Sequence, residues 1–269
     1  MGLFTGKKGM VLGVANDFSI AWAITKKLLE EGAEVGFTHL PGEKMERRVR
    51  KLAEPIGAKL ITSCNVQSDE DVARVFREAG ETYGSLDFVL HSIAFAPIED
   101  LKCAFVDSSR EGFKTAMDIS VYSLASVSRA AATVMPNGGS IATLTYYGGE
   151  KVVSGYNMMG VCKAALDAAV KYLAYDLGPR KIRVNAVSAG PVKTLAASAV
   201  GDSDKLAGLY EMVAPLGRNI TREEVGATGM FILSDLASGI TGEILHVDAG
   251  YNAMGSPGRA VEAAKSSNA

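Results

Sequence analysis

Short apolar segments and longer amphipathic segments alternate along most of this 269-residue chain. The apolar segments predict buried strands, and the amphipathic segments between them predict helices. Predicted strands cover residues 10–14, 34–38, 59–61, 86–91, 140–145, 182–187 and 244–247. Predicted helices cover residues 19–31, 43–56, 69–83, 154–177 and 221–234, with a further long helix inside 109–134. This repeated alternation favours an α/β fold with one doubly wound parallel sheet and helices on both faces.

The alternation runs without a recognisable linker or internal repeat, so we expect residues 1–254 to form a single domain. Apolar residues make up 48% of the chain, which is enough for a large core. Residues 191–215 depart from the pattern, because they carry no strand signal and are rich in small side chains. Such a long loop is typical of a functional or disordered segment. The small and polar residues 255–269 predict a flexible tail.

Charge and cysteine content exclude several classes of partner. The net charge is −2, which gives no electrostatic reason to expect nucleic acid or an anionic membrane as a partner. No apolar run approaches the roughly 20 residues that span a bilayer, and no signal sequence precedes the first strand. Cys64, Cys103 and Cys162 form no CxxC pair and accompany no histidine cluster, so no metal site is expected. We therefore expect a cytoplasmic protein with reduced thiols.

The turn after the first predicted strand could hold a dinucleotide. Gly13 would let the backbone approach a pyrophosphate, and the next helix would present free N–H groups and the positive end of its dipole. Ser19 is a suitable N-cap and could also donate its hydroxyl to a phosphate. The turn lacks the full G-x-G-x-x-G pattern, so an ordinary strand-to-helix turn with a capping serine remains the alternative.

Two other strand ends fit a dinucleotide that lies across the sheet, because ligands of such sheets bind beyond the carboxyl ends of the strands. Asn65 and Val66 follow the third strand and could hold adenine, although Asn65 could equally be a turn residue. The small residues 92–94 follow the fourth strand and leave room for a ribose. After the second strand, residues 39–43 place neither a carboxylate nor a basic residue at the strand end. The choice between NAD and NADP stays open on these residues alone.

Tyr156 and Lys163 are the candidate catalytic pair. Seven residues correspond to two helical turns, so the two side chains would share one face of the predicted helix 154–177. A phenol can donate a hydrogen bond or a proton to a developing oxyanion, and an ammonium nearby can hold ribose hydroxyls. A chance pair with a solvated lysine is the alternative, and the position after the fifth strand of a dinucleotide-binding sheet argues against it.

The spacing of this pair resembles one branch of the short-chain dehydrogenase/reductase superfamily. The usual motif of that superfamily is Tyr-x3-Lys, but four residues before Lys163 the chain has Met159, which carries no hydroxyl. A Tyr-x6-Lys pair with a second tyrosine ten residues earlier, Tyr146, resembles the NADH-dependent enoyl-acyl carrier protein reductases of bacterial and plastid fatty-acid synthesis. The resemblance covers nearly the whole chain and also rests on Gly13 and on residues 19–21, 91–97, 118–120, 183–196 and 246–248.

The resemblance implies a Rossmann-type fold, NADH as cofactor and a role for each matching position. The implied pyrophosphate contacts are Gly13, Ser19 and Ile20, and the implied adenosine contacts are Leu40, Asn65 and Val66. The implied nicotinamide-ribose contacts are Ile93 and Lys163, and the implied contacts of the nicotinamide and pyrophosphate are Val192, Lys193, Thr194, Leu195 and Ala196. The implied substrate contacts are Ala96, Tyr146 and Tyr156, and the implied catalytic residues are Tyr146, Tyr156 and Lys163.

The implied reaction is the reduction of a trans-2-enoyl thioester on acyl carrier protein. A hydride would reach C3 of the acyl chain, and Tyr156 would stabilise the enolate that forms on the thioester oxygen. The sequence leaves the role of Tyr146 open, beyond shaping the pocket. The loop after Pro191 would fold over the acyl chain and exclude water. The resemblance also implies a homotetramer.

Three positions depart from the pattern of this family. Leu40 stands where a glutamine is frequent, Asn65 where an aspartate is usual, and Ala94 where a glycine is usual. None of the three touches the hydride-transfer chemistry. Two other functions fit these residues less well. A carbonyl reductase would need a phenol at position 159, and a non-catalytic dinucleotide-binding regulator would leave the two tyrosines and the lysine without a role.

Overall fold

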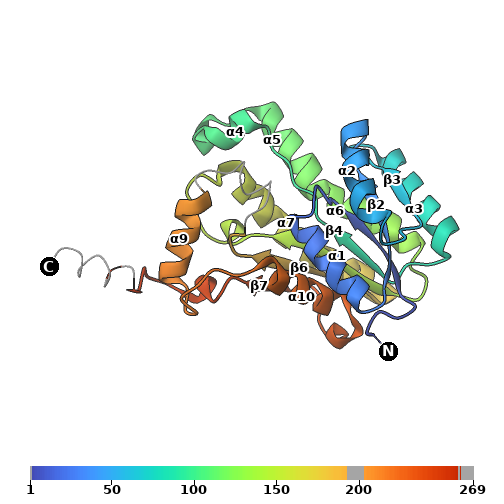
Figure 1. The fold of residues 1–269 in the computed structure, drawn as a ribbon. Coiled ribbons are helices and arrows are strands. Elements are labelled where there is room, and N and C mark those ends of the chain that lie inside the picture. The colour runs from blue at the N-terminus through green and yellow to red at the C-terminus, as the bar shows by residue number, and fades with distance from the viewer. Residues whose placement is uncertain (1, 193–202, 260, 262–269) are drawn as a thin grey trace.

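Seven strands form one parallel sheet in the order β3-β2-β1-β4-β5-β6-β7 (Figure 1). The structure is a computed structural model that describes residues 2–192, 203–259 and 261. The strands are β1 (Lys8–Leu12), β2 (Glu34–His39), β3 (Ile61–Ser63), β4 (Phe88–His91), β5 (Gly139–Thr145), β6 (Ile182–Ala189) and β7 (Ile244–Val247). The expected doubly wound α/β class is therefore confirmed.

Helices cover both faces of the sheet (Figure 1). One face packs against α1 (Ile20–Glu30), α2 (Glu43–Ala53) and α10 (Arg222–Leu233). The other face packs against α3 (Asp69–Tyr83), α6 (Ser123–Thr133) and α7 (Asn157–Leu177). The strands are buried on both sides, which explains why they appear in the sequence as nearly continuous apolar runs.

The predicted bounds hold best where the sequence carries strong end signals. Helix α3 spans the predicted residues 69–83, because Ser68 caps its first turn by accepting a hydrogen bond from the N–H of Asp71. Acidic residues 69–71 add a favourable interaction with the helix dipole. Strand β7 also spans the predicted residues 244–247. Strand β3 lies two residues later than predicted, because it covers residues 61–63 and not 59–61.

The prediction of one continuous long helix inside residues 109–134 is wrong. The segment forms α5 (Arg110–Met117) and α6, joined by a π-helical turn at Asp118–Tyr122. Ser120 lies in this wide turn, fully buried, and its hydroxyl donates to the carbonyl of Phe95 and accepts from the N–H of the same residue. These two bonds fasten the turn to the loop after β4, a long-range contact that local periodicity does not encode.

Two other helices were not predicted. The short helix α4 (Ile98–Lys102) follows the loop after β4, and α9 (Ser203–Val213) lies in the region 191–215 that was predicted to be a long loop. Helix α9 is drawn in orange in Figure 1. In the part of the chain that the structure describes, no helix has both the length and the apolar character that crossing a bilayer requires.

Candidate active site

The order of the strands reverses between β1 and β4, and Gly13 lies at this point, directly after β1. Its φ of +96° is in the region that favours glycine. A Cβ at this position would lie 1.9 Å from the carbonyl oxygen of Ser92, which follows β4. Glycine is therefore required for the backbones to approach here, and the crevice at such a reversal is where doubly wound sheets bind dinucleotides.

Ser19 caps α1, as the sequence predicted. Its Oγ accepts a hydrogen bond from the N–H of Trp22 at 3.3 Å and donates to the carbonyl of Asn16 at 2.7 Å. The cap leaves other N–H groups of the first turn, including that of Ile20, without helical partners. The free N–H groups and the dipole of α1 therefore point toward the turn that begins at Gly13, as a pyrophosphate would require.

Arg222 supports this turn from a distant part of the chain, and the sequence analysis did not identify it. Its guanidinium lies 4.7 Å from the centre of the Phe18 ring, in cation–π geometry. Its Nη1 also donates to the carbonyl of Asp17 at 3.4 Å. Arg222 is the first residue of α10, so this contact joins α10 to the turn before α1, and the two helices pack on the same face of the sheet.

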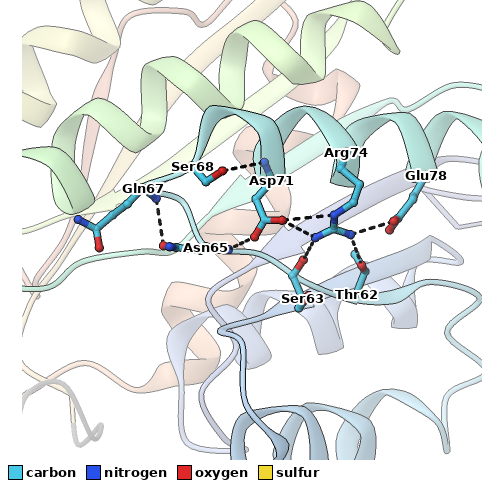
Figure 2. Close-up of polar contacts among 8 residues, drawn as sticks. All are labelled: Thr62, Ser63, Asn65, Gln67, Ser68, Asp71, Arg74 and Glu78. Carbon is cyan, nitrogen blue, oxygen red and sulfur yellow. Dashed lines mark hydrogen bonds and ion pairs between the residues drawn. The ribbon is translucent and has the colours of Figure 1, made fainter.

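Asn65, proposed for adenine, lies in a turn between β3 and α3 (Figure 2). Its Oδ1 accepts a hydrogen bond from the N–H of Gln67 at 3.2 Å, so the side chain does act as a turn residue. Its own N–H donates to Oδ2 of Asp71 at 2.8 Å. The backbone of the proposed adenine pocket is thus fixed by the first turn of the following helix.

Arg74 completes this arrangement, as Figure 2 shows. Its guanidinium donates to Oδ1 of Asp71, to the carbonyl of Ser63 at 2.6 Å and to Oγ1 of Thr62 at 3.0 Å. The hydrogen bond from the N–H of Asn65, together with Arg74, holds the pKa of the Asp71 carboxyl below its usual range. Asp71 therefore stays ionised and links the end of β3 to α3.

The other proposed cofactor contacts also lie at strand ends. Leu40 follows β2 and has 58% of its surface exposed, and its carbonyl accepts from Nδ1 of His39 at 3.0 Å if that nitrogen carries the proton. Val66 is buried in the core cluster of the α3 face, and Ile93 packs against the same cluster. Val192 lies just after β6. Gly13, Asn65, Ile93 and Val192 all follow carboxyl ends of parallel strands, so they share one edge of the sheet.

Lys163 is buried, which removes the alternative of a solvated lysine. Only 6% of its surface is exposed, and its Nζ donates to the carbonyl of Leu144 at 2.8 Å. Burial lowers the pKa of Lys163 from 10.5 to about 8, and the carboxylate of Asp167 partly opposes this shift. Asp167 lies one helical turn further along α7, and its Oδ1 has no hydrogen-bond partner among the described residues. The ammonium retains donors for a ligand, as a ribose-binding lysine requires.

Tyr156 does not lie within α7 as predicted but immediately before it, as the N-cap residue. The predicted start of the helix at residue 154 is therefore three residues too early. The ring of Tyr156 meets the ring of Tyr146 edge to face, with centroids 4.8 Å apart and an interplanar angle of 74°. Burial, and then the neighbouring Tyr146, raises the pKa of the Tyr156 phenol, so the hydroxyl is protonated at neutral pH.

Tyr210 is a part of the site that the sequence analysis missed. It lies on α9, is 2% exposed, and its hydroxyl is 2.9 Å from the hydroxyl of Tyr146. Its ring stacks on the ring of Tyr251, with centroids 3.7 Å apart and planes 9° from parallel. Tyr147, directly after Tyr146, meets Tyr251 edge to face at 5.8 Å. No local pattern connects these tyrosines, because they come from three separate segments of the chain.

Ala96, proposed for the substrate, lies in a small apolar cluster beside Tyr156. The buried members of this cluster are Ala96, Leu101, Ala116, Met158, Met159 and Cys162. Asn157 holds two of its segments together, because its side-chain amide donates to the carbonyls of Leu101 and Cys103 at 3.0 and 2.7 Å. The phenol of Tyr156 therefore borders an apolar wall, as a site for an acyl chain requires.

Lys193, Thr194, Leu195 and Ala196 lie outside the described residues, as do residues 197–202 of the loop predicted to cover the acyl chain. The described remainder of that loop, from residue 203, belongs to α9. Over the described ranges, no group of three or more His, Cys, Asp or Glu side chains is placed to hold a metal ion. The three cysteines are free thiols, as the sequence predicted.

Comparisons with known proteins agree with this geometry. Residues 13–252 match the family described as enoyl-(acyl carrier protein) reductase. The NADH-dependent enoyl-acyl carrier protein reductase FabI of Rickettsia felis is 50% identical over 255 residues, which cover 95% of this chain and 98% of that relative. FabI of Aquifex aeolicus is 49% identical over 266 residues, which cover 98% of each chain.

Solved structures give the same result. The Bacillus cereus enoyl-acyl carrier protein reductase, crystallised with NADP+ and an indole naphthyridinone, superposes with a TM-score of 0.92 at 50% identity, over 95% of this chain and 100% of that one. The enzyme of Anaplasma phagocytophilum, in complex with NAD, gives 0.90 at 50% identity, over 95% and 97%. The chain therefore belongs to the NADH-dependent enoyl-acyl carrier protein reductases, within the short-chain dehydrogenase/reductase superfamily.

Proposed function

We propose that this chain reduces a trans-2-enoyl thioester on acyl carrier protein to the saturated acyl thioester, with NADH as hydride donor, in the elongation cycle of fatty-acid synthesis. The observation that carries the proposal is the placement of Tyr156 between the ring of Tyr146 and an apolar cluster. Met159 lies in that cluster, where a carbonyl reductase of the superfamily would need its phenol.

The residues along the carboxyl edge of the sheet fit a bound dinucleotide. The close approach at Gly13 leaves a cradle without side chains, and the first turn of α1 faces it with free N–H groups. The proposed pyrophosphate contacts are Gly13, Ser19 and Ile20, the proposed adenosine contacts are Leu40, Asn65 and Val66, and the proposed nicotinamide contacts are Ile93, Lys163 and residues 192–196. When bound there, NADH supplies the hydride that saturates C3 of the enoyl chain.

Tyr156 stabilises the oxygen of the thioester. As a hydride arrives at C3, negative charge moves to this oxygen, and a phenol aimed at it lowers the energy of the enolate. The raised pKa of Tyr156 keeps the proton on the phenol until the charge develops. The site provides this donor in apolar surroundings, where its interaction with the oxygen is stronger than in water.

Lys163 holds the ribose beside the nicotinamide. Its ammonium is fixed by the carbonyl of Leu144 and has two further N–H donors. Asp167 keeps the lysine charged, because its carboxylate raises the pKa that burial lowers. The lysine therefore contributes mainly through the position of the cofactor.

Acyl carrier protein as the carrier, a homotetrameric assembly and a cytoplasmic location complete the proposal. The reductase activity of the family supports acyl carrier protein as the carrier, and the family resemblance supports the homotetramer. The low net charge and the three free cysteines, which suit a reducing compartment, support the cytoplasmic location. Light scattering of the purified protein measures the assembly, and a mass of a single chain in solution would contradict the tetramer.

One assay tests the reaction. The oxidation of NADH is followed with a crotonyl thioester, and a 3-ketoacyl thioester of the same carrier is the matched control. We expect reduction of the enoyl substrate and almost none of the ketone. Efficient reduction of the ketone would assign the chain to the carbonyl reductases instead. If NADH is oxidised with neither thioester, the result would favour a non-catalytic dinucleotide-binding protein.

A further inference from the structure

The hydroxyl of Tyr146 has a single side-chain partner among the described residues, the hydroxyl of Tyr210 at 2.9 Å. Tyr210 lies 64 residues further along the chain, on α9, which follows β6 and the undescribed residues 193–202. The bond therefore joins the segment after β6 to the segment after β5. Tyr210 is buried and Tyr146 is half-buried, so the pair does not lie at the open surface.

The ring of Tyr210 is held in place independently of this hydrogen bond. It lies parallel to the ring of Tyr251 at 3.7 Å, and Tyr251 belongs to the 3-10 turn Tyr251–Ala253. That turn is anchored by Asp248, whose carboxylate accepts from the N–H groups of Gly250 and Asn252 at 2.9 and 2.8 Å. The hydroxyl of Tyr210 thus has a defined position from which to orient Tyr146.

We infer that Tyr210 is a positioning residue for the proposed enoyl reduction, and that its hydroxyl donates to Tyr146 and leaves the Tyr146 proton free to face the substrate oxygen beside Tyr156. The inference rests on the proposed function. A tyrosine hydroxyl has one proton and two lone pairs, so accepting from Tyr210 does not use the proton of Tyr146. A hydroxyl that accepts a hydrogen bond also becomes a better donor, because the two bonds polarise each other.

The electrostatics of the pair agree with this direction of donation. Burial raises the pKa of both phenols. The hydrogen bond lowers the pKa of Tyr146 but raises that of Tyr210, which makes Tyr146 the more acidic of the two. The hydrogen bond from Tyr210 therefore stabilises negative charge on Tyr146, and a more acidic phenol is the better donor toward an enolate. Tyr146 also has its ring edge against Tyr156, so both phenols border the same space.

The test is a double-mutant cycle on enoyl reduction. We expect Tyr210→Phe to lower kcat for the crotonyl thioester by about 3- to 10-fold, the loss expected for one hydrogen bond. KM for NADH should not change. In a Tyr146→Phe background, Tyr210→Phe should have no further effect, because the hydroxyl that it orients is gone. The matched control is Tyr172→Phe, which removes a hydroxyl at a position on α7 with 74% of its surface exposed.

A second measurement does not depend on activity. Tyrosine labelled with carbon-13 at Cζ reports the hydrogen bonding of each phenol by NMR, and Tyr146→Phe assigns the Tyr146 signal. The Tyr146 shift should move in Tyr210→Phe and stay in Tyr172→Phe. Equal loss of activity by Tyr210→Phe in both backgrounds, an unmoved Tyr146 signal, or faster turnover in Tyr210→Phe would overturn the inference. If wild type fails to reduce the enoyl thioester, the proposed function fails instead, and the NMR result still tests the hydrogen bond.

Discussion

The ammonium of Lys163 donates to the carbonyl of Leu144 at 2.8 Å, and this bond joins the long helix α7 to the end of strand β5. A lysine with 6% of its surface exposed is costly to bury while charged, so an interaction that uses the charge is expected. The structure offers the carbonyl and the nearby Asp167 carboxylate. In the proposed function, the ribose of the cofactor is a third partner for the Lys163 ammonium.

Replacement of Lys163 by methionine should separate cofactor binding from folding. Methionine fills a similar volume without charge, so we expect Lys163→Met to weaken NADH binding by about 10-fold or more and to lower turnover, with the fold intact. Kd from NADH fluorescence and Tm from circular dichroism measure the two effects. The control is Lys171→Met, on an exposed position of the same helix. Unchanged affinity and turnover in Lys163→Met would exclude a cofactor role.

The same lysine predicts how NADH binding depends on pH. The free protein loses the Lys163 proton near pH 8, because burial lowers the pKa from 10.5 to about 8. NADH binding should therefore be constant at lower pH and weaken as pH rises above about 8. Titrations across this range in wild type and Lys163→Met test the assignment, since the step should vanish in the variant. A step of the same size in both proteins would assign it to another group.

Stability of the protein without cofactor should change in the opposite direction through this group. Between about pH 8 and pH 10.5 the unfolded chain keeps a proton on Lys163 that the folded chain has released. The cost of burying the charged lysine is therefore fully present below about pH 8 and is relieved as pH rises across this window, so the free energy of unfolding increases with pH there. Urea unfolding of wild type against Lys163→Met, at about pH 7 and about pH 9.5, measures the difference. A difference that is the same at both pH values would contradict the lowered pKa.

The proposed adenine side of the site depends on one carboxylate, that of Asp71. Asp71 accepts from the N–H of Asn65 and from Arg74, so Asp71→Ala leaves a backbone donor and a guanidinium without their partner. We expect a loss of about 1–2 kcal/mol in the free energy of unfolding and weaker NADH binding, because the turn that carries Asn65 is no longer fixed. The control is Glu70→Ala, an exposed neighbour on the same helix turn. Equal effects of the two substitutions would show that the carboxylate does not support the pocket.

The parts that the sequence predicted are those with local physical signals. Helix α3 carries a capping serine and an acidic first turn, and the buried strands carry apolar runs, so their places follow from neighbouring residues. The turn at Gly13 was predicted for the same reason. Three contacts were not predicted, because each joins residues that are far apart in the chain. They are the bonds of Ser120 to the backbone of Phe95, the Arg222–Phe18 contact and the Tyr146–Tyr210 bond. Such pairs exist only once the sheet has assembled.

The last prediction separates enoyl reduction from carbonyl reduction through the two site tyrosines. In carbonyl reduction the phenol must deliver a proton to the oxygen that becomes the product alcohol, so its loss is close to fatal. In enoyl reduction the hydride goes to carbon, and the oxygen is charged only transiently, so water or a second hydroxyl can partly replace the phenol. Tyr146 is that second hydroxyl, with its ring 4.8 Å from the ring of Tyr156.

We therefore expect Tyr156→Phe to lower kcat and to leave measurable reduction of the crotonyl thioester. The double variant Tyr146→Phe/Tyr156→Phe should lose much more than either single variant, by about another 10-fold, since neither phenol then faces the enolate. Tyr175→Phe, at a position on α7 with 82% of its surface exposed, is the control and should match wild type. Complete loss in Tyr156→Phe alone, together with efficient reduction of a 3-ketoacyl thioester by wild type, would contradict the enoyl assignment, because only a proton donor to a product alcohol is indispensable in that way.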